Sequence, residues 1–349
     1  MTTASRRRSV ALVMPARNEA AAVAMTLDAV FAATRLPDEI VVADGQSSDD
    51  TVARVMAYAG RGVQIRCLAN PGIFAGAGRN VAARAAHSEL LLFLDFGNRV
   101  DPGWIAAMAE PMEADPTVQA VGGLFLPDPQ NEFERSVAAM QYHLPLAVSR
   151  LSPAQKQALV PDRIRLGGLG MAVTRECYLA QGGMPAWLRA AEDNLFGRKL
   201  QHSGARVVAA LDALQHHHMR GSLRDVWRQN LVYSRGEGRI ALPWAGRLRT
   251  GGVHLVSLLL LGLAPGGLVW APLWLLTYLN TLAAHRLRRS GIHLSSRGRW
   301  LHAPGVLLAK DAGVMAGYVW GRLERLLVPR WRQQHEAYLR GGCGNGEAG

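Results

Sequence analysis

Two aspartates each end an apolar run in the first third of the chain. Asp44 closes EIVVAD (39–44) and Asp95 closes LLLFLD (90–95). Open α/β sheets bind ligands in the crevice outside the carboxyl ends of their strands. If both runs are strands of one sheet, the two carboxylates border one ligand site. The alternative is that each carboxylate only forms a turn or caps a helix.

The segments around these aspartates alternate between strand-like and helix-like patterns. Apolar runs alternate with Ala-rich or polar stretches of helical character, the runs at 10–14, 39–43, 63–68 and 90–94 and the stretches at 20–33, 49–59 and 78–86. Continuous apolar strands alternating with helices predict an α/β fold with a mixed, mainly parallel sheet and flanking helices on both faces.

Two common nucleotide-binding fingerprints are missing from this α/β pattern. Gly76-Ala77-Gly78 lacks the third glycine of a dinucleotide site, and the first strand runs into Pro15–Glu19 without any glycine. No P-loop pattern occurs. The missing glycines disfavour a Rossmann dehydrogenase.

Charge is unevenly distributed along the chain. Of 39 Lys and Arg and 27 Asp and Glu, residues 241–349 hold 13 of the basic and only 4 of the acidic residues. The basic excess of this stretch lies beside the most apolar sequence of the chain, which favours an anionic membrane surface as partner and not nucleic acid. Three well-separated cysteines exclude a disulfide framework and fit a reducing compartment.

The composition of the sequence changes after residue 252. Segments 253–264 and 268–284 are almost wholly apolar and are separated by Pro265-Gly266-Gly267. They predict a membrane hairpin that returns the following Arg-rich loop to the cytoplasm, as the positive-inside rule favours. A pair of core helices in a soluble protein is the alternative. Segment 303–320 predicts a third helix, amphipathic or partly buried in the membrane.

The N-terminal apolar run, 10–14, is too short for the core of a signal peptide. We therefore predict a globular domain over residues 1–240 that stays in the cytoplasm. Residues 241–349 are predicted to form membrane-associated helices and a basic tail, which place the protein at the cytoplasmic (inner) membrane.

Seven short segments in a fixed order resemble family 2 glycosyltransferases of the GT-A fold. The likeness covers about residues 8–240 and is nearest to membrane-associated enzymes of bacterial exopolysaccharide synthesis of the succinoglycan type. The segments are VALVMPARNEA (10–20), VVADGQSSDDT (41–51), GAGRNVA (76–82), LLFLDFGNRVDPGW (91–104), GGLGMAVTRE (167–176), AEDNLFGRKLQHSGARV (191–207) and HHHMRGSLRDVWRQ (216–229).

This resemblance implies a nucleotide-diphosphate sugar as donor. In the family, the turn after the first strand contacts base and ribose, an aspartate ending the second strand binds the base, and an arginine at a helix start meets the diphosphate. A glycine of a later loop lets the backbone approach the donor sugar or the acceptor. The matching residues are Pro15, Ala16, Arg17, Asn18, Glu19, Asp44, Arg79, Asp95 and Gly168. For Arg79, a surface salt bridge is the structural alternative.

The resemblance also implies a divalent cation, Mg²⁺ or Mn²⁺, held by an Asp-x-Asp motif that neutralises the departing nucleoside diphosphate. Asp95 matches the first acid, but Gly97 stands in place of the second. Asn98 and His218 are the candidates for a further ligand. Alternation of the three histidines 216–218 between core and solvent on a strand is the other interpretation.

Glu192 and Asp193 match the acceptor-site carboxylates of the family. By resemblance, Asp193 is the catalytic base that takes the acceptor's hydroxyl proton in an inverting transfer. Glu192 then helps to hold the acceptor or the donor sugar. An acidic pair at a helix start is also a common N-terminal capping arrangement.

The Gln-x-x-Arg-Trp signature of processive synthases is incomplete. Gln229 is present, but Val232 and Tyr233 replace the arginine and the tryptophan. This favours the addition of a single sugar to a lipid or polyprenyl-linked acceptor, with Arg220 and Arg228 as candidates for phosphate contacts.

One other function remains open, and another is disfavoured. The missing second acid at Gly97 is consistent with a catalytically weak or inactive nucleotide-sugar-binding scaffold. A sugar-phosphate nucleotidyltransferase would need a glycine-rich, basic loop after the first strand, which residues 15–19 do not provide.

Overall fold

The computed structural model describes residues 6–158, 170–242, 263 and 267–341. The chain divides into two compact units, each assembled from separate stretches. Unit 1 comprises Met1–Leu126, Val148–His218 and Gln334–Gly349, and unit 2 comprises Pro127–Ala147 and Met219–Gln333. The division at residue 240 stays a prediction.

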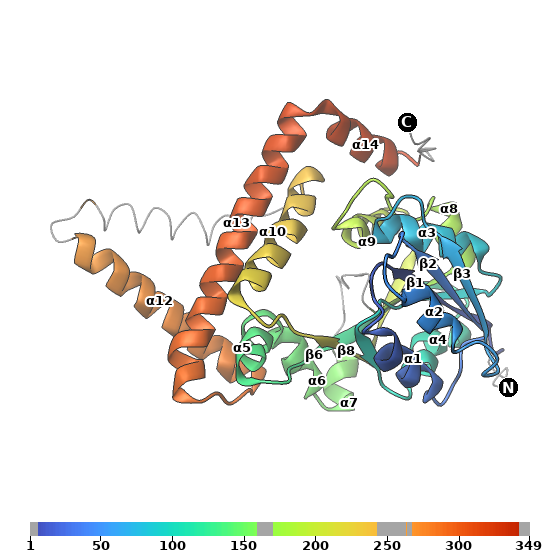
Figure 1. Cartoon of the computed structure of the whole chain (residues 1–349), viewed down its shortest axis with the longest axis horizontal. Helices are drawn as coiled ribbons and strands as arrows, with labels where there is room; N and C mark the ends of the chain where they lie inside the picture. Colours follow the sequence, from blue (N-terminus) through green and yellow to red (C-terminus); the bar gives the residue numbers. More distant parts are fainter. Residues whose placement is uncertain (1–5, 159–169, 243–262, 264–266, 342–349) are drawn as a thin grey trace. The chain divides into compact units, whose positions relative to one another are not determined.

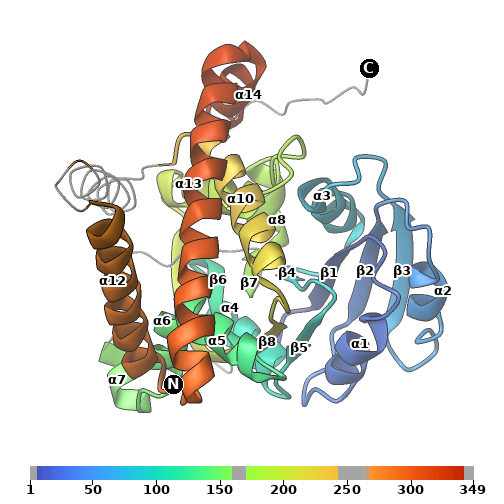
Figure 2. The same ribbon diagram turned by 60° about the vertical axis from the view of Figure 1, so that its left-hand side comes forward.

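Unit 1 is built on one mixed sheet. Its described strands follow the order β3-β2-β1-β4-β7-β6-β8-β5. The first four pair in parallel, whereas β7 runs antiparallel to β4 and β6, and β5 antiparallel to β8. The bounds are β1 Val10–Ala16, β2 Glu39–Asp44, β3 Gln64–Ala69, β4 Leu90–Phe93, β5 Asn98–Val100, β6 Val118–Asp128, β7 Met171–Thr174 and β8 Arg206–His218. The predicted α/β fold with a parallel group of strands is confirmed (Figures 1 and 2).

Helices cover both faces of the sheet, as the continuous apolar strands require. Alternate residues of β1 enter different cores: Leu12 packs with α1, α2 and α4, and Val13 packs with α3, α8 and α9. The bounds are α1 Val23–Phe31, α2 Thr51–Met56, α3 Ala75–Ala85, α4 Trp104–Ala114, α7 Pro153–Ala158, α8 Arg175–Ala180 and α9 Glu192–His202. Two buried layers therefore fix the strand ends that carry Asp44 and precede Asp95.

Unit 2 is helical. It contains α5 Glu132–Gln141, α10 Leu223–Arg239, α12 Gly267–Ser290, the π-helix η1 Gly298–His302 and α13 Ala303–Leu327. Helix α6 His143–Ser149 and helix α14 Pro329–Leu339 each begin in unit 2 and end in unit 1. Residues of α5, α10, α12 and α13 share one apolar core.

A ladder of glycines brings α10 and α13 into close contact, and the two helices run side by side in Figures 1 and 2. Gly313, Gly317 and Gly321 recur every four residues on one face of α13. A Cβ on Gly313 would lie 2.5 Å from the carbonyl oxygen of Trp227, and a Cβ on the next two glycines would meet the carbonyls of Leu231 and Arg235. Small residues at this spacing let two helix backbones approach closely.

The predicted membrane-spanning helices are not supported. Among the described residues, none of the helices is both long and apolar enough to cross a bilayer. Segment 268–284 lies in α12, and 303–320 lies in α13, where Lys310 and Asp311 interrupt the apolar sequence. The other predicted arm, 253–264, lies outside the described residues except for Leu263.

Candidate active site

A buried arginine joins the carboxylates that the sequence singled out. Arg79 Nη2 donates hydrogen bonds to Asp95 Oδ1 (2.7 Å) and Oδ2 (2.9 Å), and Nη1 donates to Glu192 Oε1 (2.7 Å). The Arg79 side chain is only 3% exposed. The structure thus brings Arg79, Asp95 and Glu192 together within unit 1, and the helix that starts with Glu192 adds Asp193 beside them.

This cluster holds one cation among three carboxylates. Burial alone would lower the pKa of Arg79, but attraction to the three carboxylates holds that pKa well above its ordinary value. Burial, reinforced by repulsion from Asp193, raises the pKa of Glu192 to about 7, although Arg79 opposes this shift. One guanidinium cannot neutralise three acids, so burial and repulsion set the direction of this shift. The Glu192 carboxylate therefore binds a proton more readily than an isolated surface carboxylate does.

Close backbone packing positions Glu192 against helix α3. A Cβ on Gly76 would lie 3.0 Å from Glu192 Cγ, so the glycine leaves room for this side chain. Ala191, which precedes α9, has a left-handed φ of 69° and provides no side-chain cap. Glu192 and Asp193 occupy the first turn of α9, where acidic residues interact favourably with the helix dipole. The Glu192 carboxylate forms an ion pair with Arg79.

Arg79 does not lie at the helix start that the sequence predicted. Helix α3 begins at Ala75, so Arg79 lies in its second turn and is buried in the site. The surface salt bridge is also ruled out, because the Arg79 side chain itself lies in the interior.

A second set of hydrogen bonds, which sequence reasoning missed, holds the residue next to Arg79 in place. Asn80 Nδ2 donates to the Met184 carbonyl (2.7 Å), while Asn80 Oδ1 accepts from Met184 N (2.8 Å) and from Tyr178 Oη (2.6 Å).

Tyr338, near the end of α14, holds the same loop. Tyr338 Oη donates to the Gly183 carbonyl (2.7 Å). The ammonium of Lys199 lies 4.5 Å from the centre of the Tyr338 ring. Loop 181–184 is thereby fixed between α3, α9 and the end of α14.

The turns that follow β1 and β2 are tied together. Asn18 N donates to Ser47 Oγ (2.9 Å), and Asn18 Oδ1 accepts from Ser48 N (2.8 Å). Glu19 N donates to Thr51 Oγ1 (2.8 Å). Pro15 and Ala16 are the last residues of β1, and Arg17 is exposed at the start of the turn. The predicted nucleotide-binding stretch is therefore a braced pair of loops at the carboxyl edge of the sheet.

Asp44 has a turn-forming role in this structure. It accepts hydrogen bonds from Ser47 N (3.1 Å) and Ser47 Oγ (2.5 Å). Beside it, a Cβ on Gly45 would lie 2.8 Å from the Ile73 carbonyl oxygen, so only glycine lets these loops meet. The carboxylate remains half-buried at the same sheet edge. Base binding by Asp44 stays a prediction.

Backbone strain gathers at the same edge. Of the five non-glycine residues with positive φ in the described part of the chain, four border these loops and α9, namely Asn18 (55°), Gln46 (61°), Ile73 (63°) and Ala191 (69°). A β-branched residue in this conformation is a genuine outlier. Strain of this kind is common at functional sites, where the surrounding structure holds it in place.

The residues proposed as metal ligands are engaged by other groups. Asn98 is fully buried; its Nδ2 donates to the Asp95 carbonyl (2.9 Å), and its Oδ1 lies 2.8 Å from His217 Nδ1. His216 Nε2 lies 2.8 Å from Asp101 Oδ1. His218 is the exposed last residue of β8. Over the described ranges, no group of three or more His, Cys, Asp or Glu side chains is placed to hold a metal ion.

Three other predicted positions are not part of this cluster. Gly168 lies outside the described residues. Arg220 and Arg228 belong to unit 2, the second of them on α10.

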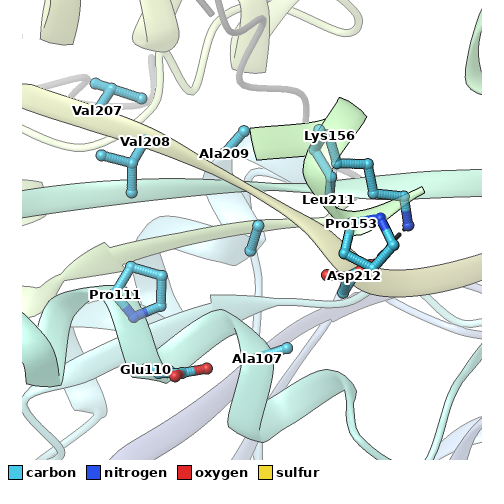
Figure 3. Close-up of a pocket in the computed structure, with 11 residues that line it drawn as sticks. Ala107, Glu110, Pro111, Pro153, Lys156, Val207, Val208, Ala209, Leu211 and Asp212 are labelled. Carbon is cyan, nitrogen blue, oxygen red and sulfur yellow. Dashed lines mark hydrogen bonds and ion pairs between the residues drawn. The ribbon is translucent and has the colours of Figure 1, made fainter. Parts of the chain in front are cut away.

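A separate cavity of about 520 Å³ lies in unit 1 (Figure 3). Its lining includes Glu110, Pro111 and the Lys156–Asp212 ion pair (2.6 Å). None of the predicted site residues borders it. We assign the chemistry to the Arg79 cluster instead, because a buried acid with a raised pKa beside a buried arginine is typical of catalytic sites.

Comparisons with known proteins agree with this fold. Residues 11–165 match the sequence family described as Glycosyl transferase family 2. An uncharacterized glycosyltransferase of Haemophilus influenzae is 26% identical over 196 residues, which cover 55% of this chain and 61% of that protein. The chain therefore matches about three fifths of the length of this curated relative.

A solved structure shows a similar fold. The mannosyltransferase PcManGT from Pyrobaculum calidifontis, in complex with GDP-Man and Mn²⁺, superposes with a TM-score of 0.54 at 19% identity, covering 92% of this chain and 88% of that one. The mixed sheet and the superposition define an α/β protein with a GT-A-like fold. Residues 11–165 resemble a glycosyltransferase family 2 domain.

Proposed function

We propose that this protein is an inverting glycosyltransferase that moves one sugar from a nucleotide-diphosphate sugar to a lipid or lipid-linked acceptor. The main support for this function is the cluster of Arg79, Asp95 and Glu192, with Asp193 beside it. The cluster includes two residues, Arg79 and Asp95, of the region that matches family 2. The braced loops after β1 and β2 offer a surface for the nucleotide at the same sheet edge. The GDP-Man complex of PcManGT supports a donor of this class.

The chemistry needs one base on the acceptor side. Asp193 takes the acceptor's hydroxyl proton while that oxygen bonds to the anomeric carbon and the bond to the diphosphate oxygen breaks. The electron pair of the broken bond leaves with the nucleoside diphosphate. Arg79 fixes Glu192 next to this base, and Glu192 accepts a hydrogen bond or donates one, depending on whether it is protonated.

Turnover of the purified full chain tests this function. Nucleoside diphosphate release is measured over a panel of nucleotide sugars with Mn²⁺ and a polyprenyl phosphate or glycolipid acceptor. We expect Asp193→Asn to lower turnover by about 100-fold or more, the usual worth of a positioned base. Glu110→Gln, an exposed acid at the other cavity, is the matched control and should leave turnover unchanged. No release from any donor, or equal release by wild type and Asp193→Asn, would contradict the proposal.

A lipid acceptor is favoured by the surface of unit 2. Trp300 and Leu301 are 64% and 62% exposed, and exposed Arg297 and Arg299 flank them. Aromatic and aliphatic side chains next to arginines suit the interface of an anionic bilayer. We therefore propose that segment 297–301 docks on the anionic cytoplasmic face of the inner membrane and holds the enzyme near its acceptor.

Vesicle sedimentation tests this docking. The full chain should bind vesicles of phosphatidylcholine with phosphatidylserine more than vesicles of phosphatidylcholine alone. The double variant Trp300→Ser, Leu301→Ser should lose most of this binding, whereas Leu144→Ser, at another exposed leucine of unit 2, should not. Equal binding by both variants would rule out this segment as the docking site.

A nucleotide-sugar-binding scaffold without catalysis is the second candidate. Gly97, which stands where the motif has its second acid, favours it. Donor binding without any transfer in the turnover assay would support this function over the enzyme.

A further inference from the structure

The divalent cation that the resemblance implies does not fit this site. The first obstacle is Gly97, at the place of the second acid. Its φ of +83° is a left-handed conformation that aspartate rarely adopts. The strand-end turn is therefore shaped around a glycine, and that position supplies no ligand.

The second obstacle is the state of Asp95. Both of its carboxylate oxygens accept hydrogen bonds from Arg79 Nη2, at 2.7 and 2.9 Å. A cation on this carboxylate would lie next to a buried guanidinium and would be repelled by it. Arg79 is held in place by Glu192 on its other nitrogen, so it is not a loose surface side chain.

The third obstacle to binding a cation is that Asn98, the next residue that could offer an oxygen ligand, is already hydrogen-bonded. Both ends of the Asn98 amide are occupied, by the Asp95 carbonyl and by His217, and the side chain is fully buried. Turning its oxygen toward a cation would break two hydrogen bonds in the interior.

We propose that Arg79 takes the place of the divalent cation on Asp95, so that the donor's diphosphate binds without a metal. This inference rests on the proposed function. A guanidinium has five N–H donors and suits both carboxylate and phosphate oxygens. In this structure its buried Nε has no hydrogen-bond partner. A phosphate oxygen bound at this donor would satisfy it while Nη2 stays on Asp95.

Calorimetric titration of the wild-type full chain with UDP and with GDP tests this inference. Each nucleotide is titrated once with EDTA and once with saturating Mn²⁺. We expect at least one nucleotide to bind in EDTA, with a Kd that Mn²⁺ changes less than about 3-fold. Binding that appears only with Mn²⁺, or tightens more than about 10-fold, would overturn the inference and leave the proposed function standing. If neither nucleotide bound under either condition, both would fail.

Variants of the arginine give an independent readout. Arg79→Met should weaken nucleotide binding in EDTA by about 10-fold or more, and Arg79→Lys should retain part of it. Arg84→Met, an exposed arginine on the same helix, is the matched control and should bind as the wild type does. Circular dichroism checks that each variant is folded. Unchanged affinity in folded Arg79→Met would also overturn the inference.

Discussion

Glu192→Gln tests which effect controls the buried cluster. Desolvation and Asp193 raise the pKa of Glu192, whereas Arg79 lowers it. Glutamine has nearly the same shape and can still accept the hydrogen bond from Arg79 Nη1 through its amide oxygen. The substitution therefore removes the ionisation and keeps the contact.

The magnitude follows from the two ends of the titration. The ordinary pKa of 4.5 becomes about 7 in the folded protein. Between these values the folded state binds more protons than the unfolded state, so stability falls as pH rises. At about 1.4 kcal/mol per pH unit, ionised Glu192 costs the wild type roughly 3 kcal/mol above neutral pH. The loss is absent below the unfolded pKa and complete above the folded one.

Urea unfolding of wild type and Glu192→Gln, followed by circular dichroism from about pH 5 to about pH 8, measures this cost. The free energy of unfolding of the wild type relative to the variant should fall by about 2–3 kcal/mol over that range. Glu110→Gln, at an exposed acid, controls for the loss of one charge. A difference that does not change with pH, or rises with it, would show that Arg79 outweighs burial and refute the reasoning.

Three further changes test the packing around the site and in unit 2. Gly313→Ala should destabilise unit 2 by about 1–3 kcal/mol, because the new methyl group meets a backbone carbonyl. Gly305→Ala, on the same helix, is the control and should be neutral or stabilising by up to about 1 kcal/mol. Urea unfolding compares the two variants, and a more stable Gly313→Ala would contradict the close contact of the glycine ladder. Tyr338→Phe should cost about 1–2 kcal/mol in unfolding free energy, because it leaves the Gly183 carbonyl without its buried donor; an unchanged urea midpoint would count against that bond. Gly45→Ala should weaken UDP and GDP binding in calorimetry by forcing the loops at the sheet edge apart, and unchanged affinity would place the nucleotide elsewhere.

Local patterns in the sequence were sufficient for the parallel strands and for the acids near their ends. Long apolar runs have few alternatives to a buried strand, and the ends of β1, β2 and β4 place their neighbours at one edge. Asp44 and the segment before Asp95 were therefore located correctly from sequence. Whether Asp44 also contacts a nucleotide depends on a ligand and is still a prediction.

The environment of Arg79 could not be predicted in the same way. The helix was predicted over residues 78–86, whereas α3 begins at Ala75. In the structure Gly76 and Gly78 belong to α3 and leave room for Glu192 and for Asn70 of the preceding loop. The partner of a helix in a folded protein is a tertiary property, and helix propensity does not contain it.

Unit 2 shows a signal that was present but not used. The spacing of Gly313, Gly317 and Gly321 already indicates a close helix contact. The apolar character of the region suggested membrane spans instead. Its partner helix α10 lies about eighty residues earlier, and no local pattern connects the two.

The hydrogen bond from Tyr338 affects how the protein can be divided for study. Gly183 and Tyr338 are separated by 155 positions, yet both belong to unit 1. A shortened chain ending at residue 240 would lack the aromatic ring and hydroxyl that lie against Lys199 and loop 181–184. Low activity in such a fragment would report a damaged support for the arginine cluster, and it would say nothing about a need for lipid.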